Sequence, residues 1–143
     1  MTAQTALSKL TKQDFLATHQ RIFNYIHRTP VMTSQTINRM SGAEVYFKCD
    51  NFQKMGAFKM RGATNAILNL TDGQRAKGVA THSSGNFAQA VALSAKYLGV
   101  KAYIVMPSNS PVVKKAAVRD YGGEITECVP TLKAREDLSL IHI

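Results

Sequence analysis

Short apolar stretches alternate with longer amphipathic ones through the second half of the chain, and this alternation constrains the fold more than any other feature. The predicted strands and helices follow one another at residues 78–81, 86–98, 102–106, 111–121 and 124–129, and a further helix begins at Thr131. The stretch "YIVM" is apolar on both faces, which is typical of a strand covered by helices on both sides. Strands separated by helices of this length pair in parallel through crossover connections. The sequence therefore predicts an α/β fold, with parallel sheets and helices on both faces.

The first half of the chain shows a less regular order of elements. Thr11 and Asp14 form a helix-start pattern, and apolar side chains then recur at helical spacing up to about His27. Pro30 makes the stretch "RTPVMTS" extended, and "EVYFKCDNF" alternates as a strand does. The remaining predicted elements are a short helix at 34–41, ended by Gly42, and a helix at 59–70, closed by "TDG".

The end of the chain is unusual for a finished domain. "TLKAREDL" starts a helix, and "SLIHI" then ends the chain before that helix is complete. A parallel sheet left at this point has an unpaired edge. We therefore expect either a truncated chain or last residues that lie outside the native reading frame.

The formal charge of +9 raises the question of nucleic-acid binding. Lysines and arginines are spread along the chain, however, and only Lys114 and Lys115 are adjacent. Tryptophan is absent, and no basic run is interleaved with aromatic residues. We therefore predict no nucleic-acid partner, and we interpret the excess charge as balanced by acidic residues in a part of the protein that this chain lacks.

The sequence also bears on location. No apolar run approaches the roughly 20 residues that a membrane span needs. The N-terminus lacks the apolar centre of a secretory signal, so we expect a cytoplasmic protein with no membrane partner. Cys49 and Cys128 fall in stretches that we interpret as buried strands, and free thiols in a reducing compartment are the expected state.

The stretch "MGAFKMRGA", residues 55–63, places Lys59 among small and apolar neighbours. A single lysine is ordinarily a solvated surface charge, but this one lies on the first turn of a predicted helix, beside Phe58. The helix dipole disfavours a cation there, so Lys59 is a candidate amine nucleophile of the kind that Schiff-base chemistry requires. Gly56 and Gly62 leave room for a flat aromatic group to approach the backbone.

The stretch "HSSGN", residues 82–86, lies where a predicted strand ends and a helix begins. In an open parallel sheet, ligands bind beyond the carboxyl ends of the strands. Backbone N–H groups at the helix start and the hydroxyls of Ser83 and Ser84 suit a carboxylate or a phosphate. An ordinary capped turn uses the same residue types, so this stretch alone leaves both interpretations open.

Together and in this order, the two motifs resemble the fold-type II pyridoxal-phosphate enzymes. The resemblance is greatest to the branch of serine racemase, the threonine and serine dehydratases, and threo-3-hydroxyaspartate ammonia-lyase. It is carried by "HRTPVMTS", "FKCDNFQKMGAFKMRGATNAI", "HSSGN", "AYIVMP" and "YGGEI", and runs from about residue 15 to about residue 137. It implies a two-domain architecture whose C-terminal half is missing here, with residues 1–76 in the larger cofactor domain and 77–143 in an incomplete smaller α/β domain.

The resemblance implies which residues meet the cofactor, pyridoxal 5′-phosphate. Lys59 matches the lysine that binds the cofactor covalently and moves the α-proton of the substrate. Phe58 matches the residue packed against the cofactor. Asn86 matches the asparagine that hydrogen-bonds the ring hydroxyl of the cofactor.

The resemblance also implies where the amino-acid substrate binds. Ser83, Ser84, Gly85 and Asn86 match the loop that holds its carboxylate. Ser84 matches in addition the serine that serves racemases of this group as acid/base on the opposite face of the cofactor. Arg135, in "KARE", lies where some relatives present an arginine toward the substrate.

The activity implied by the resemblance is β-elimination from a hydroxy amino acid such as threo-3-hydroxyaspartate, serine or threonine, giving an oxo acid and ammonia. Return of the proton from the side of Ser84 would instead give racemisation of serine or aspartate. A third alternative is a non-catalytic remnant of the fold.

Several features separate this chain from the relatives. Phe87 stands where many have His, which alters the environment of the loop before it. Met55 stands where many have Thr and Gln35 where some have Ser, which leaves nucleotide regulation open. The Gly-rich phosphate loop and the carboxylates for a divalent cation such as Mg²⁺ would lie in the missing half, and no metal ligand is assigned here. We expect a homodimer when full length, and little stability or activity from the 143-residue chain alone.

Overall fold

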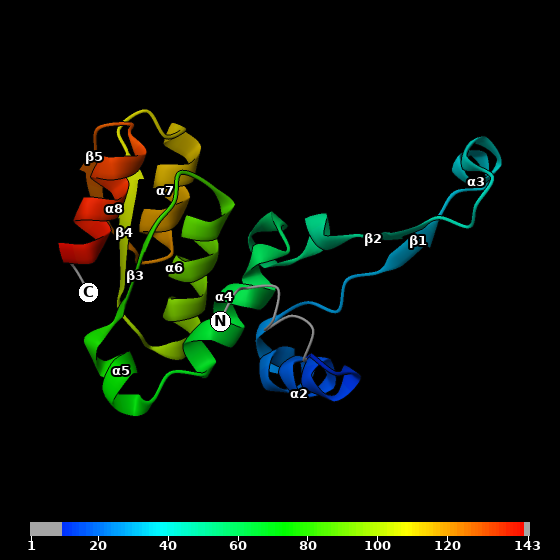
Figure 1. The fold of residues 1–143 in the computed structure, drawn as a ribbon, viewed down its shortest axis with the longest axis horizontal. Helices are drawn as coiled ribbons and strands as arrows, with labels where there is room; N and C mark the ends of the chain where they lie inside the picture. The colour runs from blue at the N-terminus through cyan, green and yellow to red at the C-terminus, as the bar shows by residue number, and fades with distance from the viewer. Residues whose placement is uncertain (1–9, 142–143) are drawn as a thin grey trace.

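The computed structural model describes residues 10–141, so residues 1–9 and the last two residues of "SLIHI" lie outside the described part. The main body is a three-stranded parallel sheet in the order β3-β4-β5, formed by Val79–His82, Ala102–Pro107 and Glu124–Cys128. Figure 1 shows α6 (Asn86–Leu98) and α7 (Val112–Asp120) on one face of this sheet and α8 (Leu132–Ile141) on the other. The predicted α/β class, with parallel strands and helices on both faces, is confirmed.

The register brings the carboxyl ends of neighbouring strands to one edge of the sheet. Val79 pairs with Ala102, and Tyr103 pairs with Glu124. Beyond the end of β3, the backbone N–H of Ser83 still donates to the carbonyl of Val105, at 3.1 Å. The connection from β3 to α6 is therefore held beside β4 at the edge where ligands of open parallel sheets bind.

Helix α4 (Lys59–Leu68) packs along α6 and supplies much of the core. The first half of α6 is rich in alanine, and small side chains let two helices approach closely. Ala63 and Ile67 of α4 join the same buried cluster as Ala88 and Ala92 of α6. Because α4 and α6 lie on opposite sides of the predicted boundary at residue 76, that boundary crosses one continuous core, and the division into two domains stays a prediction.

An arm extends away from the main body (Figure 1). It consists of β1 (Val31–Thr33), α3 (Gln35–Ser41) and β2 (Tyr46–Lys48). The two strands pair antiparallel, so the parallel pattern does not extend to this part of the chain. Their apolar side chains are largely exposed in this chain: Val31, Met32, Tyr46 and Phe47.

The predicted strand at 44–52 is too long. Only Tyr46–Lys48 pairs, because the chain then turns through two 3₁₀ segments, η2 (Asp50–Phe52) and η3 (Lys54–Gly56). Cys49 consequently lies outside the strand and is half-buried, whereas Cys128 is buried at the end of β5. Both thiols are free, as predicted.

Helix α2 (Lys12–Ile22) begins at the predicted capping box, in which the Thr11 backbone N–H donates to Asp14 at 2.7 Å. The helix ends earlier than predicted and continues as a 3₁₀ turn, η1 (Phe23–Tyr25). Ile22 and Ile26 are buried against Met60 and Leu93, which docks α2 on the start of α4.

The "TDG" stretch does not simply close a helix. Thr71 caps a further short helix, α5 (Asp72–Lys77), in which the backbone N–H of Gln74 donates to the Thr71 hydroxyl at 3.3 Å. The side-chain oxygen of Gln74 accepts in return from the Thr71 N–H at 2.9 Å. The sequence signal was present, since a Thr followed three residues later by Gln is a capping box. Among the described residues, no helix is long and apolar enough to cross a membrane.

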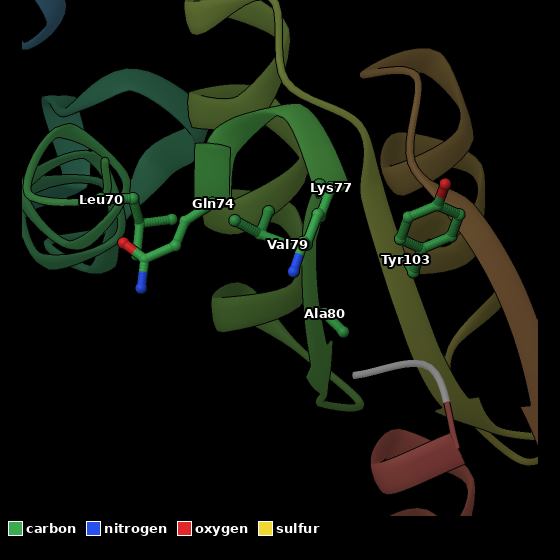
Figure 2. Close-up of a pocket in the computed structure, with 7 residues that line it drawn as sticks. Leu70, Gln74, Lys77, Val79, Ala80 and Tyr103 are labelled. Atoms are coloured by element: carbon green, nitrogen blue, oxygen red, sulfur yellow. The ribbon is translucent and has the colours of Figure 1, made fainter. Parts of the chain in front are cut away.

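A cavity of about 290 Å³ lies beside the open edge of β3 (Figure 2). It is lined by residues around α5 and at the starts of β3 and β4: Leu70, Gln74, Lys77, Gly78, Val79, Ala80 and Tyr103. These strand residues lie at the amino-terminal ends of β3 and β4. The cavity is therefore at the opposite end of the strands from residues 83–86.

Candidate active site

Lys59 is the first residue of α4, and its side chain is exposed. Its ammonium nitrogen lies 5.1 Å from the centre of the Phe58 ring and 5.8 Å from the centre of the Phe87 ring. Phe87 directly follows the "HSSGN" stretch, so the fold brings the two sequence motifs together. The positive group lies within the range at which an aromatic face attracts a cation.

The turn before Lys59 has an uncommon backbone. Met55 has φ 56° and ψ 13°, a left-handed conformation that costs a residue with a side chain about 1–3 kcal/mol. Gly56 follows with φ 74°, and its N–H donates to the carbonyl of Gln53 at 2.8 Å. This turn leaves Ala57 and Met60 buried while Phe58 and Lys59 between them are exposed. The side chains of Phe58 and Lys59 therefore point outward, while the buried residues on either side of them anchor this turn.

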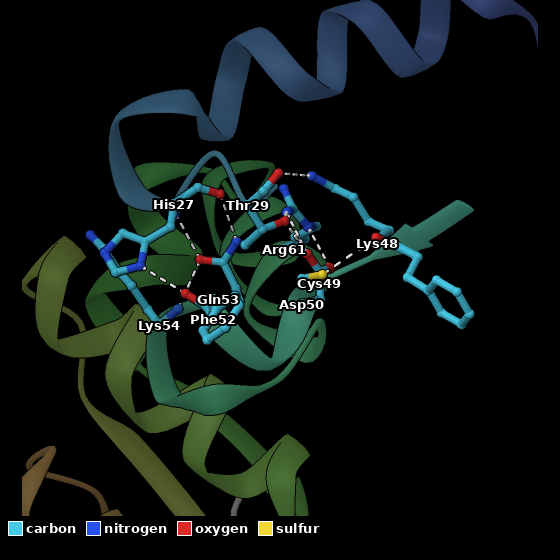
Figure 3. A network of polar contacts seen from close by, with 10 residues as sticks. His27, Thr29, Lys48, Cys49, Asp50, Phe52, Gln53, Lys54 and Arg61 are labelled. Carbon is cyan, nitrogen blue, oxygen red and sulfur yellow. Dashed lines mark hydrogen bonds and ion pairs between the residues drawn. The ribbon is translucent and has the colours of Figure 1, made fainter. Parts of the chain in front are cut away.

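A buried amide holds that turn to the segment after α2. The side-chain oxygen of Gln53 accepts from the backbone N–H of His27 at 2.8 Å and of Lys54 at 2.9 Å (Figure 3). Its NH₂ group donates to the carbonyl of His27 at 2.9 Å. Because Gln53 is only 3% exposed, losing it would leave backbone groups without partners.

A second contact fixes the first turn of α4. Arg61 donates to both carboxylate oxygens of Asp50, at 2.9 and 2.8 Å, and the Thr29 hydroxyl donates to the same carboxylate at 2.6 Å (Figure 3). The hydrogen bond from Arg61 is the main cause that lowers the pKa of Asp50 to about 2, against the opposing effect of burial. Arg61 is two residues beyond Lys59, so this ion pair holds the first turn of α4 to the segments before it.

The connection from β3 to α6 ends at a helix start without a side-chain cap. Gly85 is the N-cap residue of α6, and no side chain caps this helix. The free N–H groups at the start of a helix carry partial positive charge, which attracts a carboxylate or phosphate. The N–H of Gly85 donates to the Ser83 hydroxyl at 3.3 Å, and Ser84 is exposed.

One further residue at this site was missed by the sequence reasoning. The ammonium group of Lys114, in the first turn of α7, donates to the side-chain oxygen of Asn86 at 3.2 Å. The signal in the sequence was the adjacent pair Lys114 and Lys115, which we considered only as overall charge. Lys115 instead pairs with Glu127 at 2.8 Å, on the sheet.

Arg135 is not brought to this site. It lies on α8, and its Nε donates to the carbonyl of Thr131 at 3.3 Å. Among residues 10–141, no hydrogen bond or ion pair joins Arg135 to Lys59 or to residues 82–86. A role for Arg135 at the substrate stays a prediction.

The sequence also matches a known protein family. A family model described as pyridoxal-phosphate dependent enzyme matches residues 22–141. The chain belongs to this family. Among curated relatives of this pyridoxal-phosphate family, beta-hydroxyaspartate dehydratase of Paracoccus denitrificans is 53% identical over 127 residues, which are 89% of this chain and 40% of the relative. Serine racemase of Dictyostelium discoideum is 50% identical over 130 residues, 91% of this chain and 40% of the relative.

Solved structures of pyridoxal-phosphate enzymes show the same fold. Serine racemase from Dictyostelium discoideum matches with a TM-score of 0.88 at 49% identity, over 94% of this chain and 44% of that one. The processed form of threonine deaminase isoform 2 from Solanum lycopersicum matches with a TM-score of 0.78 at 30% identity, over 92% of this chain and 40% of that one. The predicted resemblance to the fold-type II branch is confirmed, and the chain spans about 40% of the length of the curated relatives it matches.

The residues present fit pyridoxal phosphate, the cofactor of this family. An exposed lysine amine can condense with its aldehyde, and two aromatic rings flank that amine. The uncapped start of α6 offers donors to an anionic group. In the described part of the chain, no group of three or more His, Cys, Asp or Glu residues could hold a metal ion.

Proposed function

We propose that the protein containing this chain catalyses pyridoxal-phosphate-dependent β-elimination from a small hydroxy amino acid, giving an oxo acid and ammonia. Threo-3-hydroxyaspartate, serine and threonine are the candidate substrates. The observation that carries the proposal is the approach of Lys59 to the start of α6, directly after the loop that follows β3: its ammonium nitrogen lies 5.8 Å from the centre of the Phe87 ring. The similarity to proteins named beta-hydroxyaspartate dehydratase and L-threo-3-hydroxyaspartate ammonia-lyase supports the reaction class.

Each residue has a distinct proposed task. Lys59 holds the cofactor and takes the α-proton of the substrate at its amine nitrogen. The cofactor, when bound, withdraws electrons from the α-carbon as that proton leaves. Ser83, Ser84 and Gly85 hold the substrate carboxylate with the N–H groups at the start of α6, which orients the α-proton toward the lysine.

The two aromatic neighbours of Lys59 have different proposed tasks. Phe58, which is 60% exposed in this chain, offers a ring face to the flat cofactor. Phe87 follows the second motif, at the start of α6, and limits the access of water to the amine. Asn86 donates to the ring hydroxyl of the cofactor, as developed below.

Racemisation is the second candidate, and Ser84 is the residue proposed to carry it. Ser84 is exposed in the loop after β3, and its proposed task is to hold or return a proton on the face of the cofactor away from Lys59. Several relatives are named serine racemase. Cytoplasmic location, a homodimer and a divalent cation held outside this chain also remain proposals.

The proposal is tested on the full gene product, meaning the polypeptide encoded through and beyond the codons of this chain. The purified protein, supplied with pyridoxal phosphate, is incubated with each candidate hydroxy amino acid, and ammonia, oxo acid and both enantiomers are measured. Oxo acid that disappears in Lys59→Ala supports elimination, and an inverted enantiomer that disappears in Ser84→Ala supports racemisation. If a folded protein forms neither product, the non-catalytic remnant is the correct description.

A further inference from the structure

Lys114 and Asn86 come from the first turns of two different helices, α7 and α6, and meet above the carboxyl edge of the sheet. The Lys114 ammonium donates to the side-chain oxygen of Asn86 at 3.2 Å. It also lies 3.3 Å from where a β-carbon on Gly85 would be, so the residue before Asn86 has no side chain to displace it. The lysine is half-buried between these groups rather than extended into solvent.

The position of Lys114 is not explained by the stability of its own helix. A cation in the first turn of a helix opposes the helix dipole, and α7 begins only two residues earlier, at Val112. Within residues 10–141, Lys114 has no carboxylate partner, in contrast to its neighbour Lys115. The hydrogen bond to Asn86 is therefore the interaction that holds the Lys114 ammonium group in position.

The contact also decides which way the Asn86 amide faces. The two ends of an amide are similar in shape, but one accepts hydrogen bonds and the other donates them. An ammonium group only donates, so the amide oxygen must face Lys114 and the NH₂ group must point away from it. Lys114 thus leaves the Asn86 NH₂ group to donate on the side away from the ammonium group.

We propose that Lys114 is a positioning residue that orients the Asn86 amide so that its NH₂ group donates to the ring oxygen of pyridoxal phosphate. This inference rests on the proposed function, because it assigns a task toward the same cofactor. The Lys114 charge also favours an ionised ring oxygen, since a nearby positive charge stabilises a negative one. A β-carbon at residue 85 would lie 3.3 Å from the ammonium group, which would then have to shift by a few tenths of an ångström.

The test is a double-mutant cycle on the full gene product after removal of its cofactor. Binding of pyridoxal phosphate is titrated for wild type, Lys114→Met, Asn86→Ala and the double variant, and thermal unfolding of each cofactor-free protein is recorded. Lys114→Gln provides a second uncharged variant in case one fails to fold, and Lys114→Arg retains the donor. Lys101→Met, which removes one exposed cation at the opposite end of β4, is the matched control.

We expect Lys114→Met to weaken binding about tenfold, as the loss of one charge-assisted hydrogen bond predicts, and to add nothing further in the Asn86→Ala background. Lys114→Arg and Lys101→Met should bind within about threefold of wild type, with unfolding temperatures unchanged. The long-wavelength absorbance of the bound cofactor should fall relative to its short-wavelength band in Lys114→Met, which a purely structural role would not cause.

Two outcomes would overturn the inference. Lys114 does not act through Asn86 if Lys114→Met binds the cofactor as wild type does. The same holds if Lys114→Met weakens binding by the same factor in the Asn86→Ala background. If the wild-type protein binds no pyridoxal phosphate at all, the proposed function fails together with the inference, and this result is distinct from a failure of coupling alone.

Discussion

The ammonium nitrogen of Lys59 lies 5.8 Å from the centre of the Phe87 ring, although the two residues begin different helices. Each residue lies in the first turn of its helix. Because α4 packs along α6, this packing sets the distance between them. One helix supplies a candidate nucleophile, and the other supplies a candidate anion site. The candidate site residues therefore gather at the starts of two helices that pack against each other.

Removing the Phe87 ring should weaken the site without unfolding the protein. We expect Phe87→Ala to lower kcat/KM of the full gene product about three- to fivefold, since a partly exposed cation–ring contact contributes only modestly. Phe15→Ala is the matched control, because Phe15 is 65% exposed on α2 and takes no part in the site. Equal losses in the two variants would mean that Phe87 has no specific role beside Lys59.

The ion pair of Asp50 with Arg61 should make stability depend on pH in acid. Folding lowers the pKa of Asp50 to about 2, mainly through the hydrogen bond from Arg61. A carboxylate with a lowered pKa stabilises the fold above its unfolded pKa, about 3.9, and this stability is lost as the pH falls toward the folded value. Asp50→Asn should therefore cost about 1–2 kcal/mol at pH 6 and less at pH 3.

Urea unfolding at both pH values checks this prediction. Asp14 and Glu127 also have lowered pKa values, so only the difference between wild type and Asp50→Asn isolates the ion pair. Asp72→Asn is the control, because its exposed pair with Arg75 contributes little. A cost for Asp50→Asn that is the same at pH 3 and pH 6 would contradict the assignment.

Glycine is required at residue 78 but not at residue 73. Gly78 has φ 89°, and a β-carbon there would lie 2.9 Å from the Tyr103 ring and 3.0 Å from the carbonyl of Lys101. We expect Gly78→Ala to lower the free energy of unfolding by about 2 kcal/mol or more. Gly73→Ala, in open space on α5, should leave stability equal or raise it by up to about 1 kcal/mol. Similar effects of the two substitutions in chemical denaturation would contradict this account of Gly78.

The Gln53 amide should matter for the turn that presents Lys59. We expect Gln53→Ala to destabilise the protein by about 2–3 kcal/mol, because the backbone groups of His27 and Lys54 lose their partner in a buried place. Thermal and chemical unfolding measure this loss. Gln20→Ala, on the exposed face of α2, is the suitable control. A loss no larger than that of Gln20→Ala would show that the turn is held by other contacts.

Local patterns predicted the regular elements well and the irregular ones poorly. Helix α6 has the bounds expected from its apolar period and from Gly99. Both signals are local, because they lie within the helix or directly after it. The turn with Met55 in a left-handed conformation could not be predicted, since the neighbouring Gln53 is held by contacts with His27, which is distant in sequence. The arm strand β2 was overestimated because alternation in "EVYFKCDNF" continues past the residue where pairing ends.

The candidate site divides in the same way. Lys59 and residues 83–86 were singled out from their neighbours in the sequence, and the structure places Lys59 5.8 Å from the ring of Phe87, the residue that follows Asn86. Lys114 was missed because its role depends on α7 beginning at the same edge of the sheet as α6, which only the tertiary arrangement shows. Arg135 matched by position in the sequence, yet it makes its contact with its own helix turn.

The most direct test of the central claim is to locate the cofactor on the full gene product. The protein with bound pyridoxal phosphate is reduced with borohydride, digested and analysed by mass spectrometry, beside a Lys59→Arg variant. We predict one phosphopyridoxyl group on the peptide containing Lys59, and none on that peptide in the variant. A label on Lys54 or Lys114 instead, or one spread over surface lysines in both proteins, would contradict the assignment of Lys59 as the cofactor-binding residue.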